Sequence, residues 1–188
     1  MNPTRRFVRG LIVAVLLSLL AFLYIGVQGA IATPNPDTRT AQATLSDPSG
    51  KSNLNGQVSI FETAKGLLLK AAVSDTPAGL HGFHIHEKGS CKDGGNGAGG
   101  HFNPDQVKHG KLIIDGFANA HAGDLGNILI GLDGTGSMAQ TIPGLRLTEG
   151  KYAIANRAII LHAQKDDFGQ PTGNAGGRIG CGVIALSK

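Results

Sequence analysis

Short apolar segments separated by turn sequences fill most of this 188-residue chain, and no segment shows a sustained helical period. Turn sequences such as Asp47-Pro48-Ser49-Gly50 and Asp133-Gly134 separate the segments. Glycine is abundant, at 29 residues, but apolar residues make up an ordinary 41%, as in a folded domain. The pattern predicts an all-β fold, an eight-stranded Greek-key barrel or sandwich. The predicted strands are 41–46, 56–64, 67–74, 80–87, 127–132, 137–142, 152–162 and 179–186.

Two long irregular stretches, 88–126 and 163–177, interrupt this rhythm. The first is rich in glycine, asparagine and aspartate, and most of the unusual residues of the chain lie in or beside the two stretches. Because long ordered loops in a compact β domain usually carry function, we expect the functional residues here.

The N-terminal segment has the pattern of an export signal. Residues 1–32 contain three arginines and no acidic residue, and an uncharged run over 11–27 leads to Ala30-Ile31-Ala32. We expect cleavage after Ala32, a polar linker over 33–40, one domain over 41–188, and a location in the periplasm or the extracellular space. An uncleaved membrane anchor through 11–27 is the alternative, because this run is just long enough to span a bilayer. The pair Arg5-Arg6 suggests twin-arginine export.

The positive charge of the chain belongs largely to this leader. The whole chain has 17 basic and 13 acidic residues; without the leader's three arginines, 14 basic and 13 acidic residues remain. The domain is therefore nearly neutral, which argues against nucleic-acid binding.

Cys91 and Cys181 are the only cysteines. In an exported chain they are expected to form one disulfide, and two unpaired buried thiols are the alternative. The bond would close a loop of about 90 residues and stabilise the fold by about 4–5 kcal/mol in the chain-entropy treatment.

The histidines follow a strand pattern at Gly82-Phe83-His84-Ile85-His86. Residues two apart in a strand face the same side, so His84 and His86 point one way while Phe83 and Ile85 pack on the other. Alone, this pattern also fits the polar outer face of a strand. His81 lies three residues before His84 and faces the opposite side, as a structural, hydrogen-bonded histidine would.

More candidate metal ligands occur in and near the irregular stretches. Imidazole suits both copper and zinc, and a carboxylate completes a tetrahedral zinc shell. Six histidines and one aspartate are enough for two metal sites, whereas a scatter of surface histidines is the alternative. Besides His84 and His86, the candidates are His101, His109, His121, Asp124 and His162.

Four sequences together decide between these alternatives. GFHIHE, GGHFNP, HAGDLGN and GNAGGRIGCGVI occur in this order, and together they resemble the copper/zinc superoxide dismutases over about 41–188. The resemblance implies copper and zinc as cofactors and superoxide as the substrate, which copper redox cycling converts to oxygen and hydrogen peroxide. It leaves open a homodimer and a membrane tether through 11–27.

The resemblance also implies a role for each residue. Copper would be held by His84, His86, His101 and His162, and zinc by His101, His109, His121 and Asp124. His101 would bridge the two ions and act in catalysis with Arg178, a cation beside copper that attracts the anionic substrate. Asp166 would link a copper-ligand histidine to a zinc-ligand one, and Cys91 would pair with Cys181.

Two departures from the animal enzymes affect what the resemblance implies. The His109–His121 spacing is longer and contains Leu112-Ile113-Ile114, and the 163–177 loop is shorter and poorer in charge. Lys151 and Lys165 are therefore only candidates for guiding superoxide. The competing functions are a copper carrier or zinc buffer, a copper-only dismutase and a Greek-key adhesion domain.

Overall fold

A computed structural model describes residues 39–187, so the expected leader and most of the linker lie outside the described residues. Within 39–187, no helix has the length and apolar character needed to cross a membrane. The strands are β1 (Thr40–Ser46), β2 (Asn55–Thr63), β3 (Gly66–Ser74), β4 (Gly79–His86), β5 (Asp124–Ile130), β6 (Gly136–Ile142), β7 (Ala158–His162), β8 (Arg178–Val183) and β9 (Ala185–Leu186). The helical turns are η1 (Asn96–Ala98) and α2 (Leu112–Asp115).

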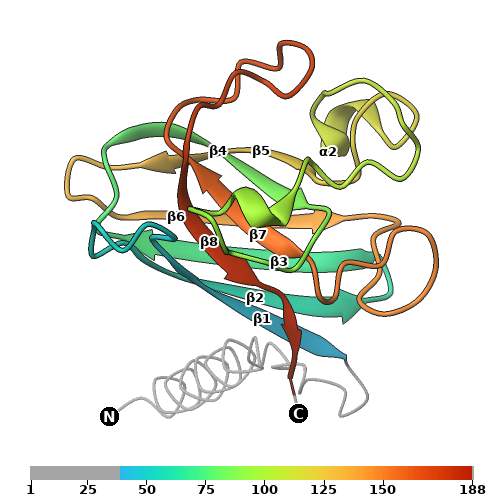
Figure 1. The fold of residues 1–188 in the computed structure, drawn as a ribbon. Helices are drawn as coiled ribbons and strands as arrows, with labels where there is room; N and C mark the ends of the chain where they lie inside the picture. The colour runs from blue at the N-terminus through green and yellow to red at the C-terminus, as the bar shows by residue number, and fades with distance from the viewer. Residues whose placement is uncertain (1–38, 188) are drawn as a thin grey trace, which may run out of the picture. The chain divides into compact units, whose positions relative to one another are not determined.

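The strands form one closed antiparallel sheet (Figure 1). Its order is β2-β3-β6-β5-β4-β7-β8-β1, and β1 pairs with β2 to close the barrel. β9 pairs with β1 just beyond β8, so the barrel of the described residues has eight strands, as predicted. In the sheet β3 lies beside β6, and β4 beside β7. These two crossings give the Greek-key order.

The core is built by strand alternation. In β1, Ala41, Ala43 and Leu45 are buried and their neighbours are exposed or half-buried, so one face of the strand packs inward. β4 and β7 differ, because their side chains are buried on both faces over His81–His86 and Ala158–His162. The long loops cover the outer face of these two strands, and the histidines lie under that cover.

One predicted strand is too long. The sequence predicts a strand over 152–162, but β7 covers only Ala158–His162. Ile154 is fully buried and its amide donates to the Arg146 carbonyl in a local pairing outside the barrel ladder. Asn156 then has φ of 61°, a left-handed conformation that interrupts an extended chain. The apolar residues of this segment favour a strand in the sequence, but only Ile154 of 152–157 is buried and the backbone turns at Asn156.

The cysteine prediction is confirmed. Cys91 and Cys181 form a disulfide with their Cα atoms 5.7 Å apart, across 90 residues of chain. The bond attaches the loop that follows β4 to β8, the strand that begins at Arg178.

Candidate metal centre

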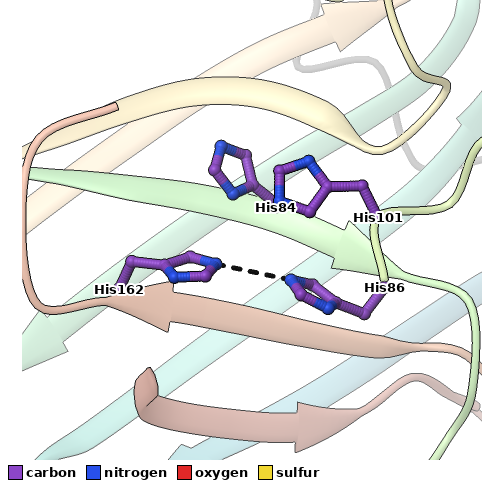
Figure 2. Close-up of side chains that lie close together, drawn as sticks. All are labelled: His84, His86, His101 and His162. Carbon is purple, nitrogen blue, oxygen red and sulfur yellow. Dashed lines mark hydrogen bonds between the residues drawn. The ribbon is translucent and has the colours of Figure 1, made fainter. Parts of the chain in front are cut away.

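Four histidines from three parts of the fold gather on the loop-covered face of β4 (Figure 2). His84 and His86 lie two apart on β4, and His162 ends the neighbouring strand β7. The β7–β8 ladder shifts register between Leu161 and His162, an irregularity of the kind that redirects a side chain beside a site. His101 joins them because an isolated bridge pairs its backbone with that of His86.

A second group lies next to the first and shares His101 with it. One ligand atom from each of His101, His109, His121 and Asp124 lies within 4.8 Å of the others, and the same holds for His84, His86, His101 and His162. Nδ1 of His101 is 2.8 Å from Asp124 Oδ1 and 3.4 Å from His121 Nδ1. The Nδ1 edge of the shared ring therefore faces the second group, which leaves Nε2 for the first.

Backbone carbonyls orient two histidines of the first group. His86 Nδ1 donates to Gly99 O at 2.9 Å, and His162 Nδ1 donates to Gly176 O at 3.1 Å. With Nδ1 protonated, Nε2 is the free electron-pair donor of each ring, and these two Nε2 atoms are 3.4 Å apart (Figure 2). The carbonyls thereby select the tautomer that can bind a metal.

Asp166 has the same effect on one histidine from each group. Its carboxylate is fully buried and accepts from His84 Nε2 at 2.9 Å and from His109 Nε2 at 2.9 and 3.1 Å. These bonds leave Nδ1 of both rings with a free electron pair that can bind a metal. Burial raises the pKa of Asp166, but the hydrogen bonds from His109 and His84 outweigh it and hold the pKa below its usual range.

The freed nitrogen atoms provide a test of whether a metal fits. Nδ1 of His84 and Nδ1 of His109 are buried and have no hydrogen-bond partner. His109 Nδ1 lies 2.9 Å from Asp124 Oδ2, close but without the geometry of a hydrogen bond. Buried polar atoms are rarely left without a partner, and a buried imidazole nitrogen with a free lone pair in each of the two groups is typical of a metal ligand. The donor sets fit copper and zinc.

Burial keeps the shared site in its metal-binding protonation state. It lowers the pKa of His86 to about 2, of His162 to about 3 and of His101 to about 4, so these rings are neutral near pH 7. Burial alone would raise the pKa of Asp124, but its close contacts with the rings of His101, His109 and His121 hold the pKa well below its usual range. Metals bind deprotonated ligands, so little proton release opposes binding at these residues.

His109 has the opposite shift. Burial lowers its pKa, but the close carboxylates of Asp124 and Asp166 outweigh this effect and raise the pKa to about 9. Two carboxylates therefore concentrate negative charge around this ring, as a site for a divalent cation requires.

Arg178 lies at the start of β8 beside the first group. Its Nη1 donates to Gly95 O at 2.7 Å and its Nη2 donates to Gly99 O at 2.6 Å. The positive charge of Arg178 contributes to the lowered pKa values of His86 and His162. The guanidinium is thus fixed by two carbonyls, with further N–H donors left over.

The other sequence candidates lie apart from both groups. Lys151 pairs with Asp105 through a short ion pair, and Lys165 is exposed. The ring nitrogens of His81 lie 2.8 Å from the carbonyl oxygens of His162 and Pro77, so this histidine is hydrogen-bonded and belongs to neither group.

Sequence reasoning missed the carbonyls of Gly99 and Gly176 and the side chain of Gln170. Gln170 holds the backbone of His109, because it accepts from His109 N at 3.0 Å and donates to His109 O at 2.8 Å. Every residue has a backbone carbonyl, so the sequence does not show which carbonyl binds a histidine. Only the glycine-rich sequence around Gly99 and Gly176 indicated that these segments are unusual. Gln170 lies 61 residues from His109, and nothing in the sequence connects the two.

The geometry agrees with comparisons to known proteins. The family model described as "Copper/zinc superoxide dismutase (SODC)" matches residues 54–184. The chain is 35% identical to "Extracellular superoxide dismutase [Cu-Zn]" of Brugia pahangi over 80% of this chain and 78% of that protein. It is 37% identical to "Superoxide dismutase [Cu-Zn] 2" of Mesembryanthemum crystallinum over 73% and 90%. The solved structure titled "Crystal Structure Analysis of the clock protein EA4" is similar with a TM-score of 0.70 and 32% identity, over 82% of this chain and 99% of that one.

Proposed function

This chain belongs to the copper/zinc superoxide dismutase family, and from that premise we propose that the two side-chain groups bind copper and zinc and that the protein disproportionates superoxide. Two superoxide anions and two protons give one oxygen molecule and one hydrogen peroxide molecule. We assign this activity to the folded domain, residues 41–188, because the strands of the barrel and β9 lie within Thr40–Leu186.

The residue types of each group support one metal for each. Copper is assigned to the group that contains His84, His86 and His162, and zinc to the group that contains the only carboxylate ligand, Asp124. Imidazole suits copper, and the three-histidine, one-carboxylate set matches tetrahedral zinc. His101 belongs to both groups and serves as the bridge.

Copper supplies the chemistry when it is bound, since it cycles between two oxidation states and so accepts one electron and returns it, which zinc cannot do. The protein supplies the other requirements. Arg178 presents a fixed cation to a small anion, and its remaining N–H groups are free to hold the anion beside the copper group. The two carbonyls keep the guanidinium in place, so little reorganisation is needed when superoxide arrives.

On the copper side, His101 can take up and give back a proton only at Nε2. Its Nδ1 is committed to the Asp124 side of the site, so only Nε2 faces the copper group. Burial lowers the pKa of this histidine to about 4, which makes the neutral ring the ordinary state and a proton held at Nε2 easily released.

The observation that carries the proposal is that a single ring, His101, belongs to both groups. The test is metal analysis of the purified protein together with a superoxide assay, on the natural sequence and on His101→Ala. We expect about one copper and one zinc per chain and activity that depends on copper, with loss of activity in the variant. Full activity of metal-free protein would overturn the proposal. Copper and zinc bound without activity would favour a carrier or buffer.

We also propose that the protein is exported. Its relative from Brugia pahangi is named an extracellular enzyme, and the disulfide suits an oxidising compartment. N-terminal sequencing of the mature protein tests cleavage after Ala32: a first residue of Thr33 supports the signal peptide, and an intact N-terminus in the membrane fraction supports the tether through 11–27. Sedimentation of the same sample measures whether it is a homodimer.

A further inference from the structure

A cavity of about 1010 Å³ lies against the zinc group. We call His101, His109, His121 and Asp124 the zinc group. The cavity is lined by three of its four residues, His101, His109 and His121, and by none of His84, His86 and His162. The cavity therefore reaches the paired site from the zinc side only. It is separate from the approach to Arg178, which does not line it either.

The cavity walls are three short segments, 101–109, 115–121 and 170–172, and none of them contains a barrel strand. Two of these segments are closed by local hydrogen bonds. Asn103 Nδ2 donates to Val107 O and Val107 N donates to Asn103 Oδ1, and Asn119 Nδ2 donates to Asp115 O. Gln170 ties the third segment to the backbone of His109, whereas no backbone hydrogen bond in the described part of the chain joins 115–121 to either of the other segments. Movement of 115–121 would therefore open a passage without breaking any strand pairing, at little cost to the fold's stability.

Exposure decreases from the cavity toward the interior of the zinc group. The His121 side chain is 7% exposed, that of His101 is 3%, and those of His109 and Asp124 are 0%. His121 therefore has the most exposed side chain of the four, and it lines the cavity. The wall also carries the Asp115 carboxylate and the Asn119 side-chain amide, whose oxygens suit a partly hydrated divalent cation. The Asn103 amide is closed on Val107, and the exposed Lys108 is the one lysine of the lining.

We propose that this cavity is the route by which zinc enters and leaves the protein, with His121 as the ligand it meets first. The proposal rests on the zinc assignment made above. It concerns the path of the ion and not its final position, so its test is kinetic. A route that is blocked slows entry and exit by the same factor and leaves affinity unchanged, whereas a change in the ligands themselves alters affinity.

Ala118 offers the means to block the route. It is exposed, lines the cavity and has no side-chain hydrogen bond to lose. Ala118→Trp places a large ring at the rim. Thr172→Trp places the same ring on the third wall segment and serves if the first variant does not fold. The matched control is Ala72→Trp on the exposed face of β3, which makes the same chemical change away from the cavity.

The experiment measures zinc release from the copper- and zinc-loaded protein into excess chelator, zinc uptake by the copper-loaded protein, and copper release as an internal reference. We expect either cavity variant to slow zinc release and zinc uptake by about tenfold or more, equally, with copper release and zinc affinity as in the natural protein. Ala72→Trp should match the natural protein in all rates.

Three results would overturn the route. They are zinc rates unchanged in both cavity variants, slowing of only one of the two zinc rates, and equal slowing of copper release. A natural protein that takes up no zinc at all would instead refute the zinc assignment, so failure of the route and failure of the proposed function are separate outcomes.

Discussion

Removing the charge of Asp166 should weaken zinc binding more than copper binding. The structure gives this carboxylate two contacts with His109 Nε2, at 2.9 and 3.1 Å, and one contact with His84 Nε2, at 2.9 Å. Asp166→Asn keeps the shape but replaces one acceptor oxygen with an NH₂ group, which cannot accept from an imidazole N–H. His109 contacts both carboxylate oxygens, so it faces the NH₂ group in either orientation of the amide, whereas His84 contacts only Oδ2 and loses its acceptor in one of the two orientations.

The magnitude follows from the number of bonds affected. A buried donor left without a partner costs about 1–3 kcal/mol. Loss of a partner that orients a ligand histidine typically reduces metal affinity by about 10- to 100-fold, which corresponds to about 1.4–2.7 kcal/mol. We therefore expect zinc affinity to fall by about 10- to 100-fold, with a smaller fall in copper affinity. Competition with chelators of known affinity measures both values.

The adjacent carboxylate is the control. Asp167 is exposed and bonds only to Asn174 and the amide of Gly169, with no contact to a histidine. Asp167→Asn should leave both affinities unchanged. Equal zinc affinities in Asp166→Asn and the natural protein would refute the reasoning, because the orienting bonds would then contribute nothing.

Three other predictions test separate parts of the site. Arg178→Ala should lower kcat/KM for superoxide by about tenfold or more at unchanged metal content, and Arg178→Lys should recover part of the lost kcat/KM. Stopped-flow rates measured at several salt concentrations check this prediction, and equal rates in the charged and uncharged variants would contradict it. Gly173→Ala should weaken zinc binding in the same chelator assay, because a Cβ there would collide with the Asp166 carboxylate and lie 2.6 Å from His109 Nε2; an unchanged affinity would show that the loop adjusts freely. In the metal-free protein, burial lowers the pKa values of His86, His101 and His162 to about 4 or below. These histidines accept protons near pH 6.5 in the unfolded chain but not in the folded one, so the free energy of unfolding must decrease as the pH is lowered from about 6.5 to about 4. Each contributes up to about 1.4 kcal/mol per pH unit, and urea unfolding at pH 7 and pH 5 should differ accordingly; equal midpoints would contradict the shifts.

The barrel was largely predictable because its strands obey simple patterns. Alternation in β1 and turn sequences such as Asp133-Gly134 place most strand ends within a few residues of their observed positions. The prediction was wrong over 152–157, where Ile154 is as apolar and buried as a strand residue but pairs locally with the Arg146 carbonyl. Hydrophobicity reports burial, and it does not report which backbone a buried residue pairs with.

The residue types of the site could be predicted, but their orientation could not. The spacing of His84 and His86 fixes a common face, and the structure brings every predicted ligand into one of two adjoining groups. Which ring nitrogen is free depends on carbonyls such as Gly99 O and on Asp166, which the fold brings from 13 and 82 residues away. The cavity beside the zinc group depends on three loops, and the length of a loop does not determine the space left between loops.

The most direct test of the central claim is anomalous diffraction at the copper and zinc absorption edges on crystals of the fully loaded protein. We expect two separate peaks on opposite edges of the His101 ring, zinc on the Nδ1 side with Asp124 and copper on the Nε2 side with His84, His86 and His162. A single ion, or two ions that do not share this ring, would contradict it.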